Sequence, residues 1–417
     1  DLVSLSVKLL DSSPLAYRVF TNFFRYVVVD EFQDSDAQQM ELVLRFTLAA
    51  TNLGSTIVAD DDQSIYRFRG AIRTNVYEIQ KRLQAQQITF EENFRSDQAI
   101  VEAANKVIAN DMQRLARQTR SISRNSGRLI QCAFGTPSDE AQQIARWANE
   151  AKQTANVENW EDIAVLCRTK NRLAQIIDEF SEIDIPCFDR NRLDFQESWE
   201  TSLCLAILSM SVDPSASGTL YQVMSALENC GLAAAMSDKD ALEVALGIRD
   251  LVNSRRRDLA NTISDWEDML TDVGLWSLLN LITSSPSEVV RLKINISNML
   301  KTLDREMKSD NLTLPQAVSR LTGLGAVQIM SGHLSKGREY DIVFFVGLEE
   351  GWLPYFRAQS EEELSEELRI FYVGMTRARH ILYLTYAQQV ANYSGRLWTK
   401  QRSRFLDYIP SQLVDRC

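Results

Sequence analysis

The sequence predicts an α/β protein whose second α/β unit is interrupted by an all-helical insertion. Residues 26–30 and 56–59 are short apolar runs rich in β-branched residues, which is typical of buried parallel strands. Residues 36–50, between these runs, carry apolar side chains at helical spacing, so the order strand, helix, strand predicts a right-handed crossover. From about residue 199 to residue 321 the strand signal disappears, and long helical patterns replace it.

Five further apolar runs predict the strands of the second α/β unit, at residues 128–134, 162–167, 326–330, 341–347 and 380–385. Two of them precede the helical insertion and three follow it, so the insertion divides this unit into two pieces of sequence. We therefore predict four segments, which run over residues 1–87, 88–198, 199–321 and 322–417.

The composition is that of a globular protein. The length of 417 residues suggests roughly three domains of about 150 residues. The content of 45% hydrophobic and 24% charged residues excludes a disordered or fibrous chain. No window reaches the roughly 18 apolar residues of a spanning helix, so a membrane is not expected as a partner. Because the formal net charge is −11, nucleic acid would have to bind in a local basic groove.

The six cysteines are scattered and form no C-x-x-C pair, which predicts reduced thiols and makes both disulfides and zinc sites improbable. His333 and His380 are the two histidines of the sequence. Mechanisms and metal sites that need several imidazoles are therefore excluded.

The run at residues 26–30 ends in Asp30 and is followed by Glu31, so a strand delivers two carboxylates to its carboxyl end. Ligands of open α/β sheets bind at that edge. Nucleotide hydrolysis needs one carboxylate to hold Mg²⁺ and a neighbour to deprotonate the attacking water. Taken alone, the pair is equally consistent with a solvated strand end followed by an acidic helix start.

Four other segments support the nucleotide interpretation, at residues 59–71, 91–96, 331–340 and 372–379. The first contains three aspartates, Gln63, and then aromatic residues alternating with arginines, which suits both phosphate sensing and base stacking. With these segments in this order, the chain resembles the UvrD/Rep-type superfamily 1A DNA helicases from about residue 26 to residue 387.

The resemblance implies RecA-like P-loop NTPase motor domains, the first truncated and the second carrying a 2B-like helical insertion. It implies ATP and Mg²⁺ as cofactors. Asp30 and Glu31 match the Walker B pair, with Asp30 as the Mg²⁺ ligand, and Gln63 matches the glutamine that senses the γ-phosphate. The remaining nucleotide contacts implied are the γ-phosphate arginines Arg95 and Arg377, the adenine-stacking Phe94, the ribose-binding Glu339, and Lys336 with Gly337 beside it.

The same resemblance implies single-stranded DNA and duplex junctions as partners, 3′ to 5′ movement, and a role in DNA repair in a bacterial cytosol or nucleoid. Its DNA contacts map onto Tyr66, Phe68, Arg69 and His333. For His333 a buried structural imidazole is an equal alternative. No protein partner is predicted.

The sequence departs from the family by containing no G-x-x-x-x-G-K-[ST] phosphate loop. Gly332 and Gly337 have the spacing, but Arg338 and Glu339 follow them in place of Lys and Ser/Thr. We therefore expect the first half of the first motor domain to be absent and the chain alone not to hydrolyse ATP. Two alternatives remain, which are a DNA-binding or partner-binding module without ATPase activity and the helicase part of a helicase-nuclease.

Two arginine groups could either guide a DNA backbone or form a solvated face. The first group is Arg114, Arg117, Arg120, Arg124 and Arg128, and the second is Arg255, Arg256 and Arg257.

Overall fold

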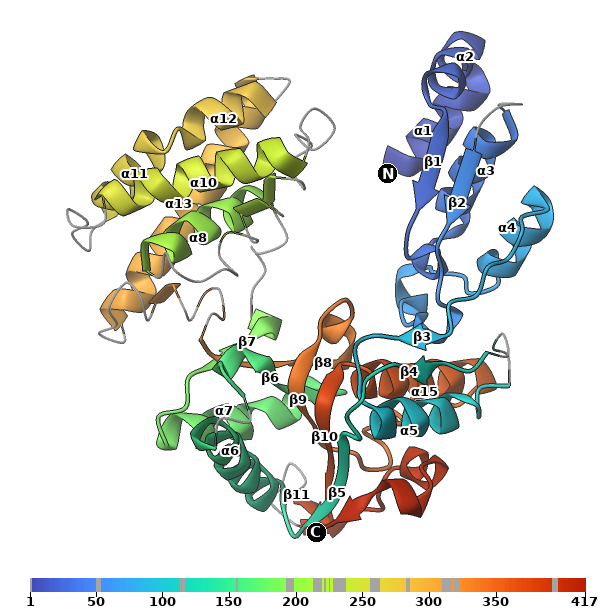
Figure 1. Cartoon of the computed structure of the whole chain (residues 1–417), viewed down its shortest axis with the longest axis vertical. Helices are drawn as coiled ribbons and strands as arrows, with labels where there is room; N and C mark the ends of the chain where they lie inside the picture. Colours follow the sequence, from blue (N-terminus) through green and yellow to red (C-terminus); the bar gives the residue numbers. More distant parts are fainter. Residues whose placement is uncertain are drawn as a thin grey trace. The chain divides into compact units, whose positions relative to one another are not determined.

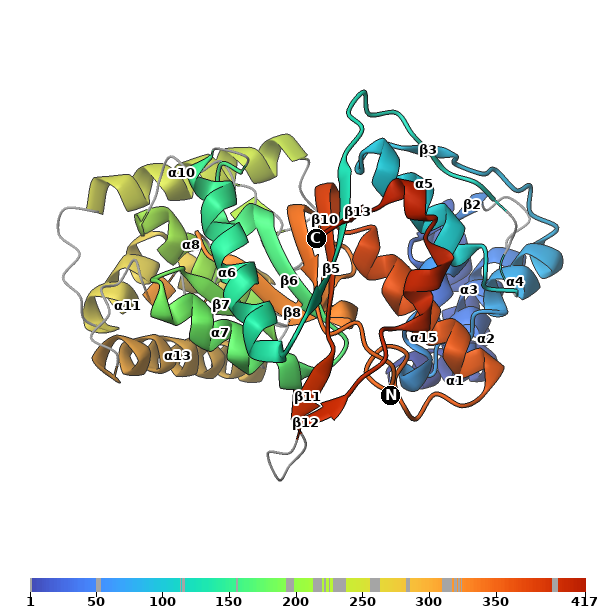
Figure 2. The same ribbon diagram turned by 90° about the horizontal axis from the view of Figure 1, so that it is seen from below.

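The computed structural model (Figures 1 and 2) describes residues 2–49, 54–112, 114, 117–154, 157–192, 199–212, 220, 223–224, 226–227, 238–255, 263–282, 286–309, 317–318, 321, 323, 325–391 and 397–417. The chain divides into two compact units. The first unit comprises Asp1–Trp147, Ile163–Ile176 and Met330–Cys417, and the second comprises Ala148–Asp162 and Ile177–Ile329. None of the helices within these described ranges is long and apolar enough to cross a membrane.

The N-terminal part of the first unit is a two-stranded parallel sheet with helices around it. Its elements are α1 (Leu2–Ser12), α2 (Pro14–Phe23), β1 (Tyr26–Val29), α3 (Ala37–Ala49), β2 (Gly54–Ile57) and α4 (Asn75–Leu83). The Ser13 side chain caps α2 by accepting a hydrogen bond from the Ala16 amide, and Pro14 begins the helix. Phe32, Leu44 and Ile79 form the buried core of this part.

The predicted order of strand, helix and strand is confirmed in this part, because β1 and β2 pair in parallel and α3 connects them. The prediction for the second strand is wrong by two residues at each end, since β2 covers residues 54–57 and not 56–59. The Val58 carbonyl accepts a hydrogen bond from the amide of Phe32. Phe32 is the first residue of a 3₁₀ turn that follows β1, so this bond is not part of the strand ladder. Asp60 then starts a 3₁₀ turn, so the ladder ends at Ile57.

The larger sheet has seven strands in the order β13-β5-β10-β9-β6-β8-β7. Their bounds are β5 (Arg128–Phe134), β6 (Ile163–Cys167), β7 (Cys187–Asp189), β8 (Val327–Ser331), β9 (Tyr340–Phe345), β10 (Ala378–Ala387) and β13 (Asp415–Arg416). The predicted strands correspond to β5, β6, β8, β9 and β10 to within two residues at each end. The α/β fold class is therefore confirmed, whereas the short strands β7 and β13 were missed.

Helices α5 (Gln98–Ile108) and α15 (Glu361–Met375) lie side by side in the first unit (Figure 1). Helix α15 begins with a capping box, in which Ser360 and Glu363 satisfy each other's backbone amides. The core between these helices and the sheet includes Ile100, Phe345, Phe371 and Leu384. The other helices next to these strands in sequence are α6 (Pro137–Gln153) and α7 (Leu173–Glu182).

The second unit contains the predicted helical insertion, made of α8 (Trp199–Val212), α10 (Asp238–Arg255), α11 (Ile263–Asp272), α12 (Leu275–Ile282) and α13 (Pro286–Ser309). Among the described residues between 199 and 321 no strand occurs, as the sequence predicts. Buried Ile207, Trp266, Leu279 and Leu300 belong to one core that joins these helices. Arg256 and Arg257 lie outside the described residues.

The prediction that the cysteines form no disulfide is wrong, because Cys132 and Cys417 are bonded with their Cα atoms 5.1 Å apart. The physical reason is strand register. Strand β13 pairs in parallel with β5, with Asp415 opposite Ile130 and Arg416 opposite Gln131, so the next residue arrives beside Cys132. A separation of 285 residues hides this proximity from the sequence.

The remaining strands form two small pairs, β3 (Glu92–Asn93) with β4 (Arg120–Ser121) and β11 (Gln389–Ala391) with β12 (Leu397–Thr399). Short 3₁₀ helices complete the described structure, of which four matter for the site: η1 (Phe32–Asp34), η2 (Asp61–Gln63), η3 (Arg67–Arg69) and η8 (Gly332–Ser335).

Candidate active site

Asp30 and Glu31 leave the carboxyl end of β1 as two exposed carboxylates, where the sequence predicts them. The Asp30 Oδ1 accepts a hydrogen bond of 2.8 Å from the Glu31 amide. Glu31 has a φ of 50°, a left-handed conformation that non-glycine residues rarely adopt. Its side chain accepts a hydrogen bond from Gln33 Nε2, and the Gln33 Oε1 accepts one of 2.9 Å from the Asp60 amide.

Lys336, from the turn after η8, brings a cation to these carboxylates. Its Nζ lies 2.6 Å from Asp34 Oδ2 and 3.4 Å from Glu31 Oε2, and it donates to the Gln63 carbonyl at 2.9 Å. Burial raises the pKa of Asp34 in spite of this ammonium group. Lys336 therefore links the acidic segment after β1 to the segment after β2.

Gln63 and Arg377 meet directly, although 314 residues separate them. The Gln63 Oε1 accepts a hydrogen bond of 3.3 Å from Arg377 Nη2, and Gln63 Nε2 donates to Asp60 Oδ2 at 2.6 Å. Arg377 is 1% exposed and donates to the Val373 and Arg338 carbonyls. Burial, followed by the nearby Arg95 charge, lowers the pKa of Arg377 to about 10, so it remains a cation at neutral pH.

Arg95 lies beside Arg377 through a shared neighbour, since its Nη1 donates to the Thr376 carbonyl at 3.4 Å. Its Nε donates to Glu339 Oε2 at 2.6 Å, and Arg379 donates to the other oxygen of Glu339. Burial favours neutral Glu339, but the hydrogen bonds from Arg95 and Arg379 outweigh it and lower the pKa of that carboxyl group. Phe94 is 76% exposed, and Gly337 is also exposed with a φ of 77°.

The predicted DNA contacts form one aromatic group with His333 at its centre. The His333 ring centroid lies 5.4 Å from that of Phe68 and 6.4 Å from that of Tyr66, and the Tyr66 hydroxyl donates to the His333 carbonyl at 3.2 Å. Residues 67–69 form η3, which places the Arg69 guanidinium 5.3 Å and 5.7 Å from the Tyr66 and Phe68 ring centroids. Phe68 is 67% exposed.

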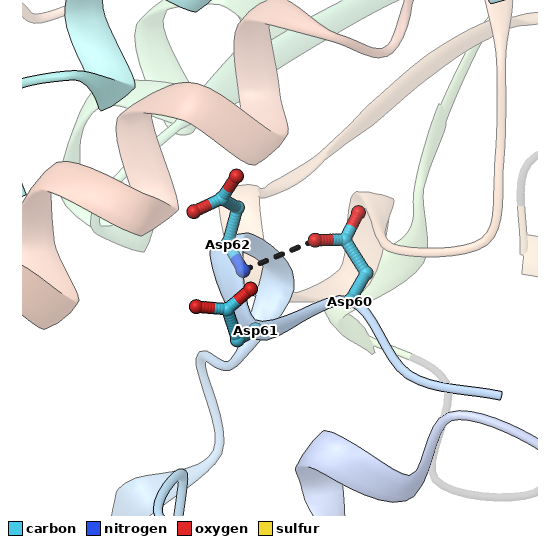
Figure 3. A group of neighbouring side chains, drawn as sticks. All are labelled: Asp60, Asp61 and Asp62. Carbon is cyan, nitrogen blue, oxygen red and sulfur yellow. Dashed lines mark hydrogen bonds between the residues drawn. The ribbon is translucent and has the colours of Figure 1, made fainter. Parts of the chain in front are cut away.

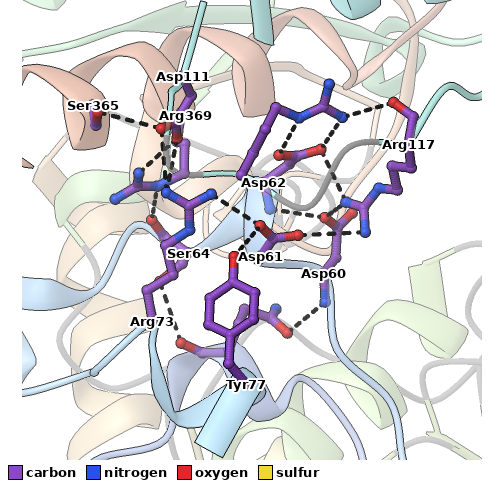
Figure 4. Close-up of polar contacts among 12 residues, drawn as sticks. Asp60, Asp61, Asp62, Ser64, Arg73, Tyr77, Asp111, Arg117, Ser365 and Arg369 are labelled. Carbon is purple, nitrogen blue, oxygen red and sulfur yellow. Dashed lines mark hydrogen bonds and ion pairs between the residues drawn. The ribbon is translucent and has the colours of Figure 1, made fainter. Parts of the chain in front are cut away.

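Figure 3 shows Asp60, Asp61 and Asp62 on the turn after β2. One carboxylate oxygen from each residue lies within 4.8 Å of the others. Such a group could hold a metal ion, but each carboxylate has an arginine partner (Figure 4). Asp60 pairs with Arg117, Asp61 with Arg73, and Asp62 with Arg114 and Arg117. We therefore assign no ion to these aspartates.

The same network extends to Asp111, which lies just after α5 and whose side chain is fully buried. Its carboxylate accepts hydrogen bonds from Arg73 at 3.0 Å and from Arg369 of α15 at 2.9 Å. Arg369 also donates to the Ser64 carbonyl at 2.7 Å. Four arginines thus balance four aspartates around residues 60–64.

These ion pairs show what two arginines of the first arginine group, Arg114 and Arg117, contact in the folded chain. Arg114 and Arg117 point into the network and face carboxylates, so they do not form a surface for a DNA backbone. Arg120 and Arg128 pair with Glu92 and Asp415 on the surface. Gln33, Arg73, Asp111 and Arg369 are parts of the site that were not predicted from the sequence. The run of three aspartates is the signal that could have indicated buried cationic partners, because adjacent buried carboxylates need opposite charges.

Comparison with known proteins places this geometry in a family. The UvrD-like helicase C-terminal domain matches residues 88–265 and 280–389, and the UvrD/REP helicase N-terminal domain matches residues 1–84. The chain belongs to the UvrD-like helicase family. The contact between Gln63 and Arg377 therefore joins its N-terminal domain to its C-terminal domain.

The relatives of this member of the UvrD-like helicase family carry consistent names. It is 28% identical to the ATP-dependent DNA helicase Rep of Buchnera aphidicola, and the match covers 99% of the chain and 69% of the relative. It is 27% identical to the ATP-dependent DNA helicases PcrA of Staphylococcus aureus and Leuconostoc citreum over its whole length. The chain spans 62% and 61% of these two proteins, less than two thirds of their length.

Proposed function

We propose that the complete protein is an ATP-dependent DNA helicase that moves along single-stranded DNA in the 3′ to 5′ direction. The observation that carries the proposal is the hydrogen bond between Gln63 of the N-terminal domain and Arg377 of the C-terminal domain. A glutamine and a guanidinium that meet across two domains, beside Arg95 and Lys336, suit the γ-phosphate of a nucleotide bound between them. Its relatives are named as ATP-dependent DNA helicases.

The residues present fit Mg²⁺ and the γ-phosphate, but not the whole triphosphate. Asp30 and Glu31 are exposed carboxylates, and carboxylate oxygens are the ligands that Mg²⁺ prefers. When bound, Mg²⁺ neutralises charge on the phosphates. In our proposal Asp30 holds the ion, Glu31 takes the proton of the attacking water, and Arg95 and Arg377 stabilise charge in the transition state.

The aromatic group around His333 supports single-stranded DNA as the substrate. An exposed phenylalanine beside an arginine offers a base a ring to stack on and a phosphate a cation to pair with. Residues 60–70 run from the network around Gln63 to Phe68 and Arg69, so nucleotide and DNA would meet opposite ends of one segment. We place this activity in the cytoplasm, at single strands and duplex junctions that arise in DNA repair.

In this proposal the phosphate loop comes from sequence outside residues 1–417, and exposed apolar side chains of the N-terminal domain are where that sequence would pack. Parallel strands are normally covered on both faces, yet Tyr26 and Val28 of β1 are 58% and 65% exposed. Leu2 and Leu5 of α1 are 82% and 60% exposed. We propose that an additional segment with the phosphate loop covers these apolar side chains in the complete protein.

The test compares the 417-residue chain with a longer protein that also carries the proposed upstream segment with the phosphate loop. We expect the chain alone to release no phosphate from ATP above buffer, with or without single-stranded DNA, because no lysine and amide cradle holds the β-phosphate. The longer protein should show hydrolysis that single-stranded DNA stimulates. Absence of stimulated hydrolysis in the longer protein would favour the binding-module alternative and overturn the proposal.

Direction and nuclease activity need separate measurements on the longer protein. Displacement of streptavidin from biotin at the 5′ end of an oligonucleotide, and not from the 3′ end, is the result expected for 3′ to 5′ movement. The opposite result would contradict the proposed polarity. DNA cut in these reactions would favour the helicase-nuclease alternative.

A further inference from the structure

Asp60 is the residue that connects Gln63 to the rest of the ion-pair network. Its Oδ2 accepts the hydrogen bond of 2.6 Å from Gln63 Nε2, and its Oδ1 accepts one from Arg117 Nη2 and one of 3.0 Å from the Asp62 amide. Both oxygens of this carboxylate therefore hold a neighbouring group in place. Oδ2 holds the Gln63 carboxamide, and Oδ1 holds the Arg117 guanidinium and the Asp62 amide. The Gln63 side-chain amide has one oxygen and one NH₂ group. Because the NH₂ group donates to Asp60, the oxygen is the group that faces Arg377.

Arg117 holds Asp60 from the C-terminal domain. It lies between α5 and β4, and its guanidinium spans Asp60 and Asp62, with Nη2 at 3.1 Å from Asp62 Oδ2 (Figure 4). The Arg117 side chain is 16% exposed, and that of Asp62 is 1% exposed. Planar guanidinium groups fix the carboxylates they bridge more rigidly than an ammonium group does.

We infer that Arg117 is a positioning residue that sets the orientation of the Gln63 carboxamide through Asp60. This inference rests on the proposed function, in which Gln63 senses the γ-phosphate. The C-terminal domain then acts on the Gln63 side chain in two ways, directly through Arg377 and indirectly through Arg117 and Asp60. Loss of Arg117 would leave Gln63 in the site with its amide wrongly placed.

Arg114 provides a matched control within the same network. Its side chain is 12% exposed, close to the value for Arg117, and it donates to Asp62 at 3.0 Å and 2.8 Å. Among the described residues, its hydrogen bonds are to Asp62 and the Arg117 carbonyl, and none is to Asp60. An effect of general network stability should therefore appear in both arginine variants, whereas an effect through Asp60 should be confined to Arg117.

The first measurement uses the chain itself without nucleotide. The ¹⁵N-labelled side-chain NH₂ signal of Gln63, identified by its loss in Gln63→Ala, reports the hydrogen bond to Asp60. We expect this signal to move in Arg117→Ala and to stay in place in Arg114→Ala. An unmoved Gln63 signal in folded Arg117→Ala would overturn the inference, whatever the activity of the protein.

The second measurement uses the protein with its natural upstream sequence. We expect Arg117→Ala to lower the kcat of DNA-stimulated ATP hydrolysis about 10- to 100-fold, because small displacements of catalytic groups have effects of this size. The KM for ATP should change less than about threefold, and Arg114→Ala should keep kcat within about threefold of wild type. Arg117→Lys, which keeps the charge but cannot bridge two carboxylates in the same way, should recover part of the loss.

A double variant separates positioning from an independent role. If Arg117 acts through Gln63, then Gln63→Ala with Arg117→Ala should have the kcat of Gln63→Ala alone, within about twofold. A multiplied loss would overturn the inference, as would normal kcat in folded Arg117→Ala. If Arg117→Ala does not fold, Arg117→Lys and Asp60→Asn carry the same comparison. A wild-type protein without DNA-stimulated hydrolysis would instead overturn the proposed function, and this inference with it.

Discussion

Residues 60–64 and residues 66–70 are neighbours in the sequence, but their side chains are distributed in opposite ways. In the first stretch the charged groups are inside, with Asp61 and Asp62 only 2% and 0% exposed. In the second stretch a large apolar group is outside, with Phe68 67% exposed. Both stretches reverse the usual distribution of charged and apolar residues in a folded protein.

The difference lies in the partners that each stretch has within the chain. Arg73, Arg114 and Arg117 neutralise the buried aspartates, which would otherwise carry a prohibitive desolvation penalty. Phe68 has an edge contact with His333 and the Arg69 guanidinium near its ring, and most of its surface is left exposed. The side chains of the first stretch have partners within the chain, whereas under the proposed function the second stretch would gain its partner from a DNA base.

Arg377→Ala should have the largest effect on the nucleotide side of this comparison. In the complete protein we expect kcat for ATP hydrolysis to fall about 10³-fold or more, because a cation at the γ-phosphate is lost. Steady-state phosphate release with saturating single-stranded DNA measures this. Arg120→Ala, which removes an arginine that is 73% exposed in an ion pair with Glu92, is the control and should stay within twofold. More than a tenth of normal turnover in Arg377→Ala would contradict the role.

The next prediction concerns Glu31→Gln in the complete protein. We expect kcat for ATP hydrolysis to be lower by about 10²- to 10⁴-fold and ATP affinity to be nearly unchanged. The amide can still accept the hydrogen bond from Gln33, but it cannot take a proton from water. Nucleotide binding measured with a fluorescent ATP analogue separates the two quantities. Parallel losses of binding and turnover would indicate that Glu31 positions the nucleotide and is not the base.

Phe68→Ala tests the other stretch and should act on DNA affinity. Stacking of one base is worth roughly 1 to 3 kcal/mol, so single-strand affinity should fall about 5- to 150-fold. The melting temperature should hardly change, because the ring is exposed; a buried phenylalanine would cost roughly 3 to 5 kcal/mol of stability. Fluorescence anisotropy with a labelled oligonucleotide and a thermal melt give both values. A much lower melting temperature with normal binding would show that Phe68 belongs to the core.

The sequence predicted the longer strands of the sheet well because apolar runs are local signals. Apolar runs such as residues 128–134 identify strands without knowledge of their neighbours, and Asp30 follows such a run directly. The structure brings Gln63 and Arg377 together, as expected for two segments of one nucleotide site, while their roles remain predictions.

The features that the sequence could not predict depend on strand register and on contacts between residues far apart in the sequence. The Cys132–Cys417 bond follows from the alignment of β13 with β5, and two-residue strands carry no periodic signal. The partners of Asp62 lie 52 and 55 residues away, so Arg114 and Arg117 were grouped with surface arginines of the same stretch. Composition showed the charges but not which of them are buried.

His333 lies beside residues 66–70, and the effect of its titration on the free energy of unfolding is the smallest effect that we predict. Burial, followed by the positive charges of Arg168 and Arg69, lowers the pKa of His333 from 6.5 to about 4. Above pH 6.5 the imidazole is neutral in both the folded and the unfolded chain, so it does not change stability with pH there. Between pH 6.5 and pH 4 the unfolded chain binds a proton that the folded chain does not, so the free energy of unfolding falls as the pH falls.

We therefore expect His333→Gln to remove part of the acid sensitivity. From pH 7 to pH 5 the wild-type free energy of unfolding should drop by about 1 to 2 kcal/mol more than that of the variant. Urea unfolding of both proteins at the two pH values measures this difference, and His380 is common to both and cancels. Equal pH dependence would mean that the His333 imidazole can be protonated in the folded chain.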